Sequence, residues 1–105
     1  MTKWIDVAPV GEFQPNTTRS VTVDTTRILV FNLDGAFYAI EDNCPHDYKP
    51  LKDGKIDGHQ VICPWHGARF DIKTGKALSA PAYEGVATFP TRVENDLVQV
   101  EWSDE

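Results

Sequence analysis

The chain has 105 residues and a mass of 11.8 kDa, so a single domain with one modest core is expected. Its 41% hydrophobic and 25% charged residues are typical of a globular protein and exclude long disordered, collagen-like or coiled-coil chains. The net charge of −6 disfavours nucleic acid as a partner, because an acidic protein repels phosphate backbones. We see no apolar run of the roughly 18–20 residues of a membrane helix and no signal-peptide stretch, so we expect a cytoplasmic protein with no membrane partner.

Short β-prone runs separated by turn signals follow one another along the chain. They are residues 20–23, 28–33, 37–40, 69–72, 91–94 and 97–102. Asp34-Gly35 and Asn95-Asp96 each separate two of these runs and predict hairpins, while Thr74-Gly75 predicts a turn after residues 69–72. No window of a dozen residues has helical periodicity. We therefore predict an all-β fold, an antiparallel β-sandwich or incomplete barrel.

The segment from about residue 41 to 82 has a different composition from the rest. It carries both cysteines, all three histidines and four of the prolines. We interpret it as a subdomain of loops that projects from a β base made by residues 1–40 and 83–105, within one domain of residues 1–105.

Each cysteine in this segment is followed closely by a histidine. The pattern is Cys44-Pro45-His46, sixteen residues, then Cys63-Pro64-Trp65-His66, or C-x-H-x16-C-x2-H. Two Cys and two His in paired clusters make a four-ligand site for a soft or borderline metal. A single disulfide is the other use of two cysteines, but thiols stay reduced in the cytosol. Zinc fingers usually place two to four residues inside each pair, so the single-residue gap is uncommon for zinc.

This spacing resembles the binding motif of the Rieske iron–sulfur proteins. The resemblance extends to Gly67, to Phe70-Asp71 with the turn that follows it, and to the proline segment around Pro81. It implies a Rieske-like fold with a cluster-binding loop subdomain and one [2Fe–2S] cluster per chain. Cys44 and Cys63 would be thiolate ligands of one iron, and His46 and His66 would be ligands of the other.

The length resembles that of the stand-alone Rieske-type ferredoxins of bacterial multicomponent oxygenases. The resemblance implies a monomeric one-electron carrier with no catalytic residues of its own. Its partners would be a flavin-dependent NAD(P)H reductase and a terminal Rieske non-haem iron oxygenase, as in the dioxygenase systems of aromatic hydrocarbon catabolism.

Four positions predict a low reduction potential within this family. High-potential members link the two loops by a disulfide, whose positions hold Lys49 and Trp65 here. Those members also donate hydrogen bonds to the cluster from a Ser and a Tyr, where this chain has Ala68 and Phe70. We expect a potential near the lower end of the Rieske range, around −150 mV.

Other residues in and near the loops have two interpretations each. Pro45 and Pro64 stiffen the loops around the metal or only form turns, and Pro81 lies in a covering loop or a plain turn. Gly67 permits a close backbone approach or only a turn. The two aromatic candidates for contact with a partner, or for shielding the site from water, are Tyr48 and Trp65. Acidic residues (41, 42, 47, 53, 57) and lysines (49, 52, 55) alternate here, which argues against a docking patch of one sign.

Two other functions remain open from the sequence. One is the small subunit of another oxidoreductase complex such as nitrite reductase, although such subunits commonly lack the cluster ligands. The other is a structural zinc module that binds a protein. His59 has no cysteine close to it in sequence and is expected to be a solvated loop residue.

Overall fold

The computed structural model describes residues 2–42, 54–64, 67–78 and 85–103. Within these ranges the strands are β1 (Thr2–Pro9), β2 (Thr18–Val23), β3 (Thr26–Leu33), β4 (Ala36–Glu41), β5 (Lys55–Asp57), β6 (Gln60–Ile62), β7 (Arg69–Asp71), β8 (Thr88–Phe89), β9 (Thr91–Glu94) and β10 (Leu97–Ser103). A short 3-10 helix, η1 (Val10–Glu12), follows β1. No helix in the described ranges is long and apolar enough to cross a membrane.

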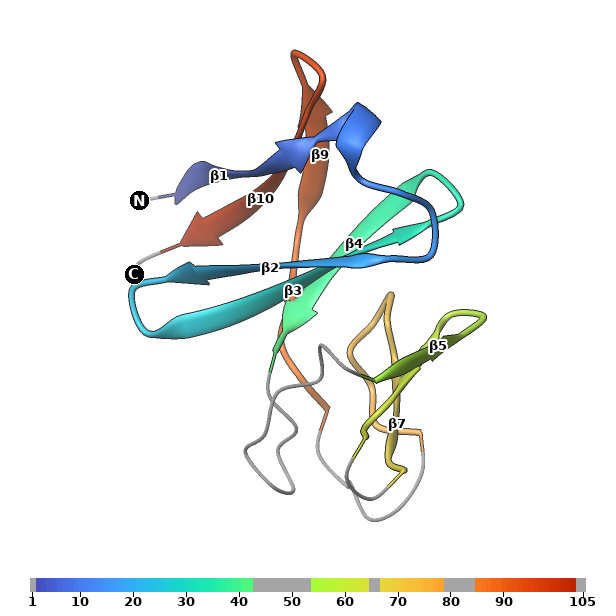
Figure 1. Ribbon diagram of the computed structural model, residues 1–105. Helices are drawn as coiled ribbons and strands as arrows, with labels where there is room; N and C mark the ends of the chain where they lie inside the picture. The colour runs from blue at the N-terminus through green and yellow to red at the C-terminus, as the bar shows by residue number, and fades with distance from the viewer. Residues whose placement is uncertain (1, 43–53, 65–66, 79–84, 104–105) are drawn as a thin grey trace.

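The strands pair into three antiparallel sheets. Their orders are β1-β10-β9, β2-β3-β4-β8 and β5-β6-β7. In Figure 1 the four-stranded sheet runs across the middle, with β1, β9 and β10 on one side and β5–β7 on the other. We call the first two sheets (β1–β4 and β8–β10) the base, and the third (β5–β7) the small sheet.

β3 explains why the sheets are layered in this way. A strand with one wet face alternates buried and exposed residues, but β3 is buried at every position from 28 to 33. Its two faces belong to different cores. The core between the two base sheets includes Ile28, Val30, Ala39, Val98 and Val100. The core between the base and the small sheet includes Leu29, Phe31, Ile40, Val61, Cys63, Ala68, Phe70 and Ile72.

Both predicted hairpin turns are confirmed. Asp34 and Gly35 have φ angles of 54° and 94°, and Asn95 and Asp96 have φ angles of 52° and 63°. A two-residue loop with positive φ at both positions is a type I′ turn, whose twist matches that of the strands it joins. Asn, Asp and Gly adopt this backbone at the lowest cost, so the turn pairs set the register of β3–β4 and β9–β10.

The all-β prediction is confirmed, and the described strands form separate antiparallel sheets with no closed barrel. Within residues 41–82 the predicted run at 69–72 corresponds to β7, but β5 and β6 of the small sheet were not predicted. Strands β5 and β6 have three residues each, too few to show alternation in the sequence. Strand β1 was also missed, because it pairs with β10 from the other end of the chain.

Candidate metal centre

Cys63 lies directly after β6, where the small sheet meets the base. Its side chain is 1% exposed and its thiol is free. Its backbone N–H donates to the carbonyl of Ala68 at 2.7 Å, and its own carbonyl accepts from the N–H of Gly67 at 3.1 Å. These two bonds close the segment that contains the second Cys-His pair, so the thiol is fixed in position at the edge of the core.

The neighbours of Cys63 in the motif differ in exposure. Pro64 is exposed, whereas Ala68 is fully buried against the core. Gly67 has a φ of 72°, and no described atom lies within 4 Å of the point where a Cβ would be. In the described structure, the backbone conformation is therefore what requires glycine at this position.

Most of the predicted site lies outside the described residues. This holds for the ligands Cys44, His46 and His66, and for the neighbouring residues Pro45, Tyr48, Lys49, Trp65 and Pro81. In the described ranges, no three or more His, Cys, Asp and Glu side chains gather into a metal site, and three of the four predicted ligands lie outside those ranges.

The segment with the first Cys-His pair leaves the base at the end of β4. There the N–H of Glu41 donates to Ala87 and the N–H of Asp42 donates to Arg27, both at 2.8 Å. The side chain of Asp42 is 1% exposed. Sequence reasoning grouped Asp42 with the other acidic residues around the loop, and no local pattern distinguishes this buried carboxyl group from them.

Gly75 and Gly85, which lie before and after residues 79–84, bring the two flanking parts of the chain into close contact. The N–H of Val86 donates to the carbonyl of Gly75 at 2.7 Å. A Cβ on Gly75 would collide with the carbonyl of Val86, and one on Gly85 would stand 2.5 Å from the carbonyl of Gly75. The Asp71 carboxylate accepts the N–H groups of residues 73 and 74, which builds the turn. The sequence predicted the turn at Gly75 but not the contact with Gly85.

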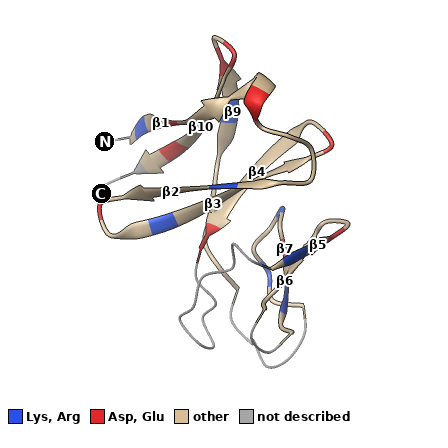
Figure 2. Ribbon diagram, viewed as in Figure 1, with Lys and Arg blue, Asp and Glu red and all other residues tan. Residues whose placement is uncertain are grey.

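The described charges around this region are of mixed sign, while acidic residues 47 and 53 and lysines 49 and 52 of the predicted alternation lie outside the described residues. Figure 2 shows basic and acidic residues on both the base and the small sheet. On the small sheet, Arg69 forms an ion pair with Asp57 at 3.1 Å. His59 is exposed at the β5–β6 turn, as predicted for a solvated loop residue.

Chemically, the described residues fit a soft metal group. Cys63 offers a free thiol in a dry environment, and thiolates together with imidazoles are donors that iron–sulfur clusters accept. Burial in a packed core limits solvent access, which is one of the factors that set a cluster's potential.

Comparison of the fold with solved structures indicates a class of electron-transfer proteins. The chain matches a chain in the complex of reduced oxygenase and oxidized ferredoxin in carbazole 1,9a-dioxygenase, with a TM-score of 0.90 and 32% identity over 97% of this chain and 95% of that one. A putative NADH-dependent nitrite reductase small subunit from Mycobacterium tuberculosis has a TM-score of 0.89 at 21% identity, covering 100% and 99% of the two chains. This second likeness shows the fold alone.

Sequence comparison gives the family. The chain is 33% identical over 101 residues to the ferredoxin component of the naphthalene 1,2-dioxygenase system of Pseudomonas putida, covering 96% of this chain and 97% of that protein. Residues 3–90 match the model of the Rieske [2Fe-2S] domain, and the chain belongs to this family. The resemblance predicted from the Cys-His spacing is thus confirmed, and with it the [2Fe–2S] cluster as the cofactor.

Proposed function

We propose that this chain is the ferredoxin of a multicomponent oxygenase system. It accepts one electron at a time from a flavin-dependent NAD(P)H reductase and passes it to a terminal oxygenase with a Rieske cluster and a mononuclear iron. The observation that carries the proposal is the match to a dioxygenase ferredoxin component over 96% of this chain and 97% of that protein. The carrier works as a monomer in the cytoplasm and does no substrate chemistry itself.

The proposed ligands are two residues from each Cys-His pair. Cys44 and Cys63 bind one iron as thiolates, and His46 and His66 bind the other as neutral imidazoles. This donor set gives the oxidised cluster a formal charge of about zero, against about −2 with four thiolates, so the cluster accepts an electron more readily. We assign the ligands to a cluster-binding subdomain of about residues 41–82.

The described residues support the site in two ways. Cys63 is buried, and its backbone hydrogen bonds to Gly67 and Ala68 limit the movement of its thiol. A site that moves little between the two states has a low reorganisation cost for electron transfer. Trp65, Tyr48, Lys49, Pro45, Pro64 and Pro81 are the candidates for shielding the cluster or contacting the redox partners.

Purified protein tests the proposal in two stages. We expect a red-brown protein that becomes EPR-active on dithionite reduction, with one unpaired electron per chain. We then expect it to restore electron flow from a flavin reductase and NADH to a ring-hydroxylating oxygenase. A colourless, EPR-silent protein that contains zinc would instead favour the structural zinc module. A loaded protein that supports a nitrite reductase but no oxygenase would favour the small-subunit function.

A further inference from the structure

The outer face of the small sheet carries a polar network. In the ladder, Asp57 pairs with Gln60 on β6, and Arg69 on β7 pairs with the residue two positions after Gln60. Alternate residues of a strand point to opposite faces, and Val61 and Phe70 point into the core. Asp57, Gln60 and Arg69 therefore share the face turned away from the core.

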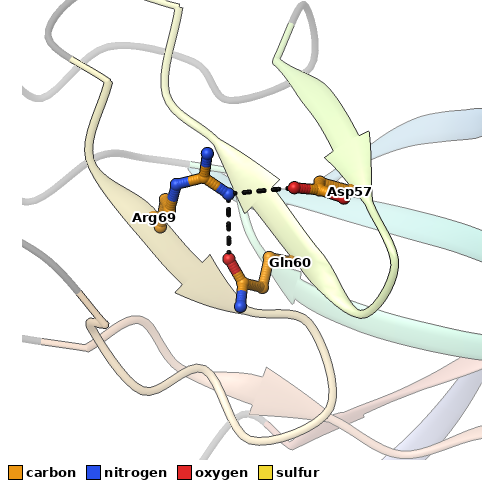
Figure 3. Close-up of polar contacts among 3 residues, drawn as sticks. All are labelled: Asp57, Gln60 and Arg69. Atoms are coloured by element: carbon orange, nitrogen blue, oxygen red, sulfur yellow. Dashed lines mark hydrogen bonds and ion pairs between the residues drawn. The ribbon is translucent and has the colours of Figure 1, made fainter.

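One guanidinium nitrogen joins all three strands of this sheet. Nη1 of Arg69 donates to Oδ2 of Asp57 at 3.1 Å and to Oε1 of Gln60 at 3.1 Å. Figure 3 shows one nitrogen of the Arg69 guanidinium with separate dashed lines to Asp57 and to Gln60. The side chains of Arg69 and Asp57 are 40% and 68% exposed, so the ion pair is open to solvent and to salt.

These strands are the ones that lead into both ligand-bearing segments. β5 begins two residues after residues 43–53, which contain Cys44 and His46. β6 ends directly before Cys63, and β7 begins three residues after His66. The network therefore connects the strand that follows the first Cys-His pair with the strands on either side of the second pair.

The backbone ladders of this sheet are short. β5 pairs with β6, and β6 with β7, through three residue pairs each, whereas β2 and β3 pair through six. The positions of the inter-loop disulfide found in high-potential relatives hold Lys49 and Trp65, so that covalent link is absent. On the outer face of the described small sheet, the contacts of Arg69 with Asp57 and Gln60 add to these short ladders in holding the three strands together.

We propose that the Asp57–Gln60–Arg69 network is a clamp that keeps the two ligand-bearing segments at the separation required by the bound cluster. The inference rests on the proposed function and its ligand set. It assigns Asp57, Gln60 and Arg69 as positioning residues, which act on cluster retention through the strands and not by touching the cluster. An ion pair that was only a surface feature would leave retention unchanged.

The test uses the loaded protein and the variants Asp57→Asn and Arg69→Gln. Loss of visible absorbance is followed in excess iron chelator, at low and at high salt. At low salt we expect both variants to lose the cluster about two- to fivefold faster than wild type, the ratio that corresponds to an exposed ion pair. Asp57→Asn isolates the pair most cleanly, because Arg69 makes further contacts. High salt should speed the wild type toward the rate of the variants.

Three controls separate a clamp from a general loss of stability. The double variant should lose the cluster no faster than Arg69→Gln alone, because both changes remove the same contact. Arg69→Lys should recover part of the retention. Arg92→Gln, which removes a guanidinium bound to Gln99 on the base, should retain the cluster as wild type does. Thermal unfolding followed by tryptophan fluorescence should differ little among all of these proteins.

The clamp would be overturned if both single variants kept the cluster as long as wild type does. It would also be overturned if the effects of the two changes on the rate of cluster loss were additive in the double variant, or if these rates did not depend on salt. The EPR spectrum of reduced wild type distinguishes this result from a failure of the proposed function. A wild type without an iron–sulfur signal overturns both proposals, whereas a normal signal with unaffected variants overturns the clamp alone.

Discussion

The base and the small sheet are stabilised in different ways. β3 at the centre of the base pairs with β2 and with β4 through six residue pairs each and is buried on both faces. The strands of the small sheet pair through three residues each, with one face on the core and a polar network on the other. From this contrast we expect the base to fold on its own packing. Under the proposed ligand set, we expect the order of the small sheet to depend also on the bound cluster.

The largest expected effect is complete loss of the cluster from a protein whose base stays folded. Replacing the buried Cys63 with Ser removes a proposed thiolate ligand, and we expect the visible absorbance to disappear while the far-UV circular dichroism of the base remains. The matched control is His59→Ala at the exposed β5–β6 turn, which should keep full absorbance. A Cys63→Ser protein with a normal spectrum would remove Cys63 from the ligand set.

A pair of buried isoleucines sharpens the comparison. Ile28 lies in the core of the base and Ile72 lies next to the small sheet, and both are fully buried. Each change to Ala should lower the free energy of unfolding by about 2–5 kcal/mol, measured by denaturant titration. Only Ile72→Ala should also speed cluster loss in a chelator. Equal cluster loss in the two variants would mean that the regions are not separately stabilised.

The sequence predicts features with local signals and misses those that depend on residues far apart in the chain. The base hairpins were predictable because their signals are local: alternating strands joined by Asp34-Gly35 and Asn95-Asp96. The family and its cofactor were predictable because ligand chemistry demands particular residue types at particular spacings, whereas the ligand positions themselves stay a prediction. Strand β1 was not, because its partner lies at the other end of the chain, and the burial of Asp42 depends on packing that no local pattern records.

A pair of turn glycines tests a contact that sequence reasoning missed. Gly75 and Gly58 both have positive φ, but a Cβ on Gly75 would meet the carbonyl of Val86, whereas one on Gly58 would meet no described atom within 4 Å. Gly58→Ala should cost about 1–2 kcal/mol of stability from the left-handed backbone alone. Gly75→Ala should cost more, because the contact with the chain around Gly85 must also open. Equal losses on denaturant titration would show that this contact has no energetic role.

The smallest expected effect changes the electronic properties of the site and leaves its architecture intact. Ala68 is fully buried beside Cys63, at the position where high-potential relatives carry a Ser whose hydroxyl donates to the cluster. A hydrogen bond that favours the reduced state by about 1 kcal/mol raises a one-electron midpoint by roughly 40 mV. Ala68→Ser should therefore raise the midpoint in a redox titration from a wild-type value around −150 mV.

Two outcomes of that titration would count against this explanation of the low potential. A clearly positive wild-type midpoint would show that the missing hydroxyl and the missing disulfide do not set the potential. An unchanged midpoint in Ala68→Ser, with the cluster fully retained, would show that the hydroxyl does not reach a cluster sulfur from this position. Arg92→Gln on the base is the matched control, because a charge change distant from the small sheet should leave the midpoint where it is.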